Sequence, residues 1–138
     1  MASTTAFTNP AKQDYLNGVH QPADVYKIAL YTASATNDKT MAAYSATNEV
    51  TGTGYTATGQ VLVGFTVSIS GDTAYLDFTT DPSWSGATFT AASCVIYNST
   101  RSNKAIAVID FGGAFTATAG TFTLTFPSPG ASALIRIA

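Results

Sequence analysis

Residues 61–80 read VLVGFTVSISGDTAYLDFTT, and this stretch decides the fold. From Val61 to Ile69, every second residue is Val, Phe or Ile, and the residues between them are Leu, Gly, Thr and Ser. This alternation is typical of a β-strand with one buried face. Ser70-Gly71-Asp72 is a turn sequence, and residues 73–80 alternate again. The stretch therefore predicts a β-hairpin.

The rest of the chain repeats this pattern on either side of the hairpin. Further strands are expected at residues 25–32, 87–97, 105–111, 121–126 and 133–137. Turn sequences separate them, among them residues 81–86, which carry the only Trp, and the glycine-containing segment 112–120. Seven or eight short strands at this spacing predict an all-β fold, an antiparallel β-sandwich that is jelly-roll-like.

The N-terminal part of the chain reads differently. Residues 1–8 are rich in Ser, Thr and Ala and are expected to form a loose arm. Asn9-Pro10 predicts the start of a helical turn over residues 11–17, with Asn9 as its cap, and Gly18 ends it. We therefore divide the chain into an arm and connector, residues 1–24, and a β-sandwich domain, residues 25–138.

Composition excludes several classes of partner. Charged residues are 10% of the 138 residues, and the net charge is −2. Nucleic-acid binding needs clustered Lys and Arg, which are scattered here, so we expect no nucleic-acid partner. No apolar run approaches the roughly 20 residues of a membrane helix, so we expect no membrane partner. The first residues lack the pattern of a secretory signal, which favours synthesis in a cytoplasm.

The chain offers few groups for chemistry. Its one Cys, Cys94, lies in the apolar run 91–97, and its one His, His20, lies in the connector. We therefore expect an inert buried thiol, no catalytic triad, no cofactor and no transition-metal site. Calcium bound by aspartates in turns stays an alternative. The protein is not expected to be an enzyme.

Paired carboxylates leave one enzymatic alternative open, because a glycosidase needs two of them in one cleft. Asp72 and Asp81 lie in turn sequences, which Asp favours for local hydrogen bonds. Asp77 is expected to face outward from its strand. Asp110, between Ile109 and Phe111, is the one expected to be partly buried. A hydrolase using Asp110 requires a second carboxylate to converge on it.

The tract at residues 49–59 reads EVTGTGYTATG and loosely fits the dinucleotide-binding pattern G-x-G-x-x-A. That motif requires a helix to begin within the glycine loop, whereas a β-strand follows here. The glycines therefore predict a bent loop with close approach of the backbone.

Aromatic residues give the strongest indication of a contact surface. The chain has seven Tyr and one Trp, types that are enriched in protein interfaces. Tyr55 in a glycine loop and Trp84 in a turn are expected to be hard to bury within one domain. The short N-terminal helix is expected to dock through Tyr15 and Leu16. We therefore predict Tyr15, Leu16, Tyr55 and Trp84 as protein-interface residues.

Several of these segments together resemble small virion-structural proteins of tailed bacteriophages, in particular capsid cement (decoration) proteins of the jelly-roll type. The resemblance runs from about residue 11 to 111. It is carried by VYKIALY at 25–31, YSATNEV at 44–50, GTGYT at 52–56, and Trp84 ahead of TFTA at 88–91.

The resemblance implies a protein without catalytic residues, made in the cytoplasm of a host bacterium and located in the virion on the capsid surface. Its expected partner is the major capsid protein, whose neighbouring subunits it would bridge, and it is expected to be a homo-oligomer, a dimer or trimer. A carbohydrate- or receptor-binding module of a phage tail or head fibre is the alternative, which would present Trp84 and some of the tyrosines on an exposed platform.

Overall fold

The computed structural model describes residues 2–137, which form eight strands and one helix. Residues 1 and 138, the outer ends of the predicted segments 1–24 and 25–138, lie outside the described residues. The elements are β1 (Ala6–Phe7), α1 (Asn9–Leu16), β2 (Tyr26–Tyr31), β3 (Gln60–Val61), β4 (Phe65–Ser70), β5 (Thr73–Phe78), β6 (Ser83–Asn98), β7 (Lys104–Thr123) and β8 (Ile135–Ile137).

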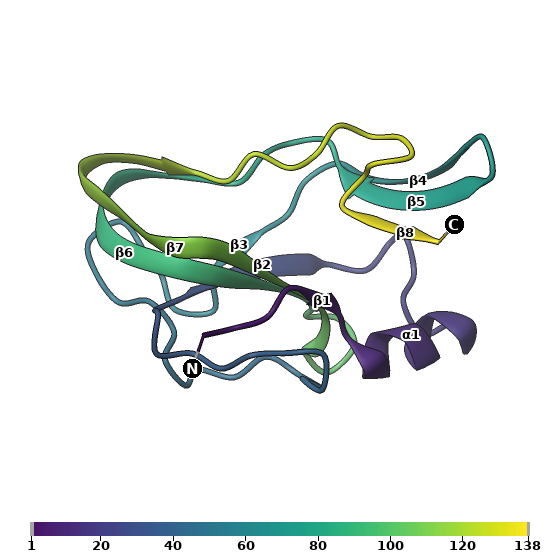
Figure 1. Ribbon diagram of the computed structural model, residues 1–138, viewed down its shortest axis with the longest axis horizontal. Helices are drawn as coiled ribbons and strands as arrows, with labels where there is room; N and C mark the ends of the chain where they lie inside the picture. Colours follow the sequence, from purple (N-terminus) through teal and green to yellow (C-terminus); the bar gives the residue numbers. More distant parts are fainter. Residues whose placement is uncertain (1, 138) are drawn as a thin grey trace.

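The strands form two antiparallel sheets, which confirms the predicted all-β sandwich. One sheet has five strands in the order β1-β7-β6-β2-β3, and the other has three in the order β4-β5-β8. In Figure 1 the three-stranded sheet lies over one end of the larger sheet, and α1 lies on the opposite side of that end. The sequence does not predict this order, because strand periodicity says nothing about which strands pair.

The long hairpin of β6 and β7 is the centre of the larger sheet. The turn predicted at residues 81–86 is wrong for residues 83–86, and the loop predicted at residues 112–120 is wrong throughout. Trp84 lies in β6 and pairs with Phe122, while residues 112–120 continue β7. The ladder shifts register at four places, where a β-bulge or irregularity interrupts the regular pairing of the two strands.

The larger sheet is buried on both faces where β2, β6 and β7 meet. One face contributes Ile28, Leu30 and Ile96 to the cluster shared with the three-stranded sheet. The other face contributes Tyr31 and Tyr97 to a second cluster, which residues of the segment 32–59 cover. A strand buried on both faces has no polar side, which explains why β2 is apolar at nearly every position.

The covering segment 32–59 is held by contacts that substitute for regular secondary structure. Isolated bridges join it to the sheet between Tyr31 and Glu49, Ala43 and Lys104, and Thr53 and Thr88. Gly54 has a φ of 85°, and a Cβ on it would stand 2.9 Å from the carbonyl oxygen of Gly86. The close backbone approach predicted for the glycine tract is therefore confirmed, and its neighbour is β6.

The N-terminal residues are ordered against the larger sheet, so the predicted loose arm is wrong for residues 2–8. β1 pairs antiparallel with β7, and the backbone N–H of Thr4 donates to the carbonyl of Asn37. α1 begins earlier than predicted, because Thr8 is its cap in place of Asn9. The Thr8 hydroxyl accepts a hydrogen bond from the N–H of Ala11, at 3.2 Å.

The chain crosses from the larger to the smaller sheet at Gly64, which interrupts the single long strand predicted for residues 61–69. Before the crossing, β3 pairs with β2; after it, β4 pairs with β5 in the predicted hairpin. Gly64 has a φ of 81°, and a Cβ at this position would overlap the Thr79 hydroxyl. Both the backbone conformation and the space therefore require glycine here.

Substituting Gly64→Ala should lower the free energy of unfolding by about 3 kcal/mol, since strain at positive φ adds to a steric clash. Urea unfolding followed by circular dichroism measures this change. Gly71→Ala is the matched control: its φ is 59°, but the space around it is open. The control should lose about 1 kcal/mol, and equal losses in the two variants would contradict a packed crossing at Gly64.

Candidate interaction surface

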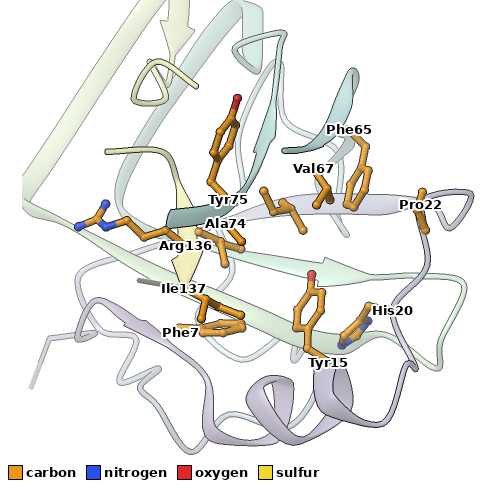
Figure 2. Close-up of a pocket in the computed structure, with 12 residues that line it drawn as sticks. Phe7, Tyr15, His20, Pro22, Phe65, Val67, Ala74, Tyr75, Arg136 and Ile137 are labelled. Carbon is orange, nitrogen blue, oxygen red and sulfur yellow. The ribbon is translucent and has the colours of Figure 1, made fainter. Parts of the chain in front are cut away.

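An apolar cleft opens between the three-stranded sheet and the N-terminal elements β1 and α1 (Figure 2). Its volume is about 300 Å³. The residues that line it are Phe7, Tyr15, His20, Pro22, Phe65, Val67, Ala74, Tyr75, Leu76, Ile135, Arg136 and Ile137. These residues come from five elements and a connector, so no local motif in the sequence reveals the cleft.

One wall of the cleft is the face of β4 that carries Phe65, Val67 and Ile69. Phe65 is partly buried against the core, where its ring stacks on that of Tyr26 with centroids 5.0 Å apart. Along the same face, Val67 is 60% exposed and Ile69 is 73% exposed. Figure 1 shows the β4–β5 turn reaching past the end of the larger sheet. An apolar face that begins in the core therefore continues into solvent.

The opposite wall is built from α1 and the connector that follows it. The ring of Tyr15 packs against those of His20 and Phe7, with centroids 4.7 and 5.7 Å away. Figure 2 shows the Tyr15 hydroxyl pointing into the cleft, and this oxygen has no hydrogen-bond partner among residues 2–137. Burial raises the pKa of Tyr15 and lowers the pKa of His20. Burial in this wall therefore favours the uncharged forms of both side chains.

Asp24 fixes the connector to the turn between β6 and β7. Its Oδ2 accepts hydrogen bonds from Arg101 Nε at 2.9 Å, Asn98 Nδ2 at 2.8 Å and the backbone N–H of Gln21 at 3.0 Å. The hydrogen bond from Arg101 is the main reason that the pKa of Asp24 falls to about 2. The Asp24 carboxylate thus fixes the connector that carries His20, although Asp24 itself does not line the cleft.

The structure brings Tyr55 and Trp84 together, but in the core. Their ring centroids are 6.3 Å apart, and both rings pack against Phe89. Trp84 is 6% exposed, so the expectation that it is hard to bury is wrong. Its local sequence predicts a turn, whereas the fold has strand β6 there. A contact with another chain through these two residues stays a prediction that the single chain does not test.

Tyr55 has a structural role that the sequence did not indicate. Its hydroxyl donates to Glu49 Oε1 at 2.6 Å and accepts from the backbone N–H of Leu30 at 3.0 Å. Glu49 also accepts hydrogen bonds from the Tyr44 hydroxyl and the backbone N–H of Thr58. Tyr55 thereby satisfies a backbone donor of β2 that has no strand partner at that point.

Tyr15 and Leu16 are adjacent in α1 but face different surroundings. Tyr15 lines the cleft and packs against the core, whereas Leu16 is 90% exposed and does not line it. Sequence reasoning missed Val67, Ile69 and Ile137 as surface residues. The alternation around Val67 was the available signal, but alternation marks an apolar face without telling whether the fold covers it.

The groups considered for catalysis do not gather around Asp110. Asp110 pairs with Ser93 in the larger sheet, and the hollow it lines has no second acidic residue among its described lining. Asp77 was expected to face outward, but it is fully buried under the segment before β8, and burial raises its pKa. Cys94 is fully buried, as predicted. Within residues 2–137, no three His, Cys, Asp or Glu side chains are grouped to hold a metal ion.

The structure is an all-β sandwich with an apolar cleft at one end. A comparison of the chain with protein-family models, curated proteins and solved structures finds no match. No helix within residues 2–137 has the length and apolar character needed to cross a bilayer. The resemblance to capsid cement proteins therefore rests on the sequence segments quoted above.

Substituting Tyr55→Phe should lower the free energy of unfolding by about 2 kcal/mol, because it leaves the Leu30 N–H and the Glu49 carboxylate short of a partner. Thermal and urea unfolding measure this loss. Tyr75→Phe is the control, since the Tyr75 hydroxyl makes no hydrogen bond within residues 2–137. A Tyr55→Phe variant as stable as the control would show that the hydroxyl does not support β2.

Protonation of Asp24 should destabilise the protein in acid. Its folded pKa of about 2 lies below the ordinary Asp value, so its contribution is present above about pH 4 and is lost as the pH falls through 2. Asp24→Asn should be less stable at pH 7 and should lose less stability between pH 4 and pH 2. Urea unfolding at a series of pH values measures both effects, and parallel curves for the two proteins would contradict the role of Asp24.

Proposed function

We propose that this protein is a capsid cement (decoration) protein that binds the outside of a bacteriophage head. In this role it stabilises contacts between neighbouring subunits of the major capsid protein. The observation that carries the proposal is the apolar cleft and the exposed apolar face beside it, on a chain with few charges. Contiguous exposed apolar surface on a small domain marks a site of association with another protein.

The chemistry of the surface favours a large protein partner. Charged groups must lose hydration when an interface forms, and imperfectly paired ones cost free energy. The cleft carries one charged side chain, Arg136, among its lining residues. A shell presents the same contact many times on a fixed lattice, so modest contacts made by an oligomer add through effective concentration. The virion location is part of the same proposal.

The alternative of a carbohydrate- or receptor-binding module receives less support. That function needs aromatic rings exposed on a platform where sugars stack, and Trp84 was its main candidate. Trp84 is buried against Phe89 and Phe122, so it offers no such platform. We therefore do not advance this alternative as a second candidate.

The test mixes the protein at micromolar concentration with purified, expanded capsid shells that lack a cement protein. We expect the protein to sediment with the shells and to raise the temperature at which they burst. Absence of co-sedimentation at this concentration would reject the proposal. The copy number per shell distinguishes a shell component, with hundreds of copies, from a tail part with a few.

A pair of variants tests whether the cleft is the docking surface. Ile137→Lys places a charge on the cleft rim, where Ile137 is 65% exposed, and should weaken shell binding at least about tenfold. Phe115→Lys is the matched control, because Phe115 is 53% exposed on β7 and lines no part of the cleft. Equal binding by the two variants would remove the cleft from the interface, and melting temperatures verify that both fold.

A further inference from the structure

The free edges of the two sheets differ in how well they are protected against pairing with another strand. In the described residues, β1 and β3 are edge strands of two residues each, and β8 has three residues and carries Arg136. The part of β7 beyond β1 is interrupted by register shifts and by Ala119 at a φ of 47°. Short length, charge and bulges are the usual means of blocking edge pairing.

β4 has none of these protections. It is a six-residue edge strand, Phe65–Ser70, that pairs with β5 residue for residue without a register shift. Its sequence, FTVSIS, has no charged residue and no proline. Val67 and Ile69 are largely exposed on it. Such an edge is a template for another strand.

The register of the hairpin shows which backbone groups are free. The two-residue turn at Gly71-Asp72 makes Ser70 and Thr73 the closing pair, and the backbone N–H of Thr79 donates to the carbonyl of Gly64. Because hydrogen-bonded and non-hydrogen-bonded pairs alternate, the even-numbered residues of β4 direct their backbone groups to β5. The N–H and C=O groups of Phe65, Val67 and Ile69 therefore point away from the sheet.

The sequence of β4 is nearly symmetric about Val67. An antiparallel partner with the same sequence, placed on a two-fold axis through Val67, sets Phe65 opposite Ile69 and Thr66 opposite Ser68. Aromatic–β-branched pairs and Thr–Ser pairs are favourable cross-strand neighbours. In this register Phe65, Val67 and Ile69 of one copy, whose backbone groups are free, lie opposite the same three residues of the other copy. Each Asp72 lies far from its symmetry mate. No like charges are brought together along the strand.

We propose that two copies of this chain associate through β4, edge to edge and antiparallel, with Val67 on the two-fold axis. The two three-stranded sheets become one six-stranded sheet, and the apolar faces that flank the two clefts become continuous. This inference does not depend on the shell role, because it concerns the free protein. The contact is smaller than a standard interface, so we expect a dissociation constant of about 10–100 µM.

The test is sedimentation velocity of the full chain from about 5 to 500 µM. We expect a monomer at the low end and a dimer at the high end. Val67→Pro should be monomeric throughout, because proline removes an outward donor while leaving the β4–β5 ladder intact. A wild-type protein that is monomeric at 500 µM, or a folded Val67→Pro variant that dimerises like the wild type, would overturn the proposal.

Disulfide trapping tests the register without relying on the proline variant. Residues opposite each other in an antiparallel ladder have Cα atoms about 5.5 Å apart, within disulfide range. Val67→Cys should therefore form a covalent dimer at about 200 µM under mild oxidation, since the native Cys94 is fully buried. Ile137→Cys, on the opposite edge of the same sheet, is the control. Cross-linking of Val67→Cys no faster than the control would reject this pairing.

Discussion

The antiparallel pairing of β6 with β7 is the constraint on which the rest of the structure depends. β2 attaches to β6 and β1 attaches to β7, so the larger sheet exists only once this hairpin has formed. Because the hairpin is buried on both faces near its turn at residues 99–103, the larger sheet must be covered on both sides. The three-stranded sheet covers one face, and the segment 32–59 covers the other. Tyrosine hydroxyls satisfy polar groups where this irregular segment packs on the sheet: Tyr55 donates to Glu49, and Tyr31 donates to the carbonyl of Ser45.

The smaller sheet is longer than the surface it covers, and this mismatch creates the cleft and the exposed face. Phe65 lies over Tyr26 in the core, but the continuation of the same strand face through Val67 has no part of the larger sheet beneath it. A monomeric protein gains nothing from such an extension, since exposed apolar area favours association or aggregation. A protein that binds other subunits gains binding free energy from it, because the exposed apolar face becomes buried on assembly. The scarcity of charge on the same surface fits this reading, since it keeps the desolvation cost of assembly small.

The sequence predicted the features that depend on neighbouring residues and missed those that depend on distant ones. The β4–β5 hairpin, the all-β class and the buried thiol of Cys94 follow from local alternation and composition. Trp84 was misplaced because Pro82 and Gly86 resemble a turn, whereas pairing with residues around Phe122 extends β6 back to Ser83. Asp77 was expected outside because its neighbours alternate, and the segment that buries it comes from beyond residue 126. The cleft joins Phe7 to Ile137, so its existence is a property of the topology.

The closure of both sheets by residues beyond 104 has a consequence for how the chain acquires its structure. β1 pairs with β7, which lies about 100 residues later in the chain, and β5 pairs with the later strand β8. A polypeptide emerging from the ribosome therefore exposes the β4–β5 hairpin before β8, which completes its sheet, has been synthesised. Contacts so distant in sequence make folding slow, and an uncharged strand exposed meanwhile invites sticking between nascent molecules. Low temperature or holdase chaperones during production should therefore reduce aggregation of the incompletely folded chain, without changing the stability of the folded protein.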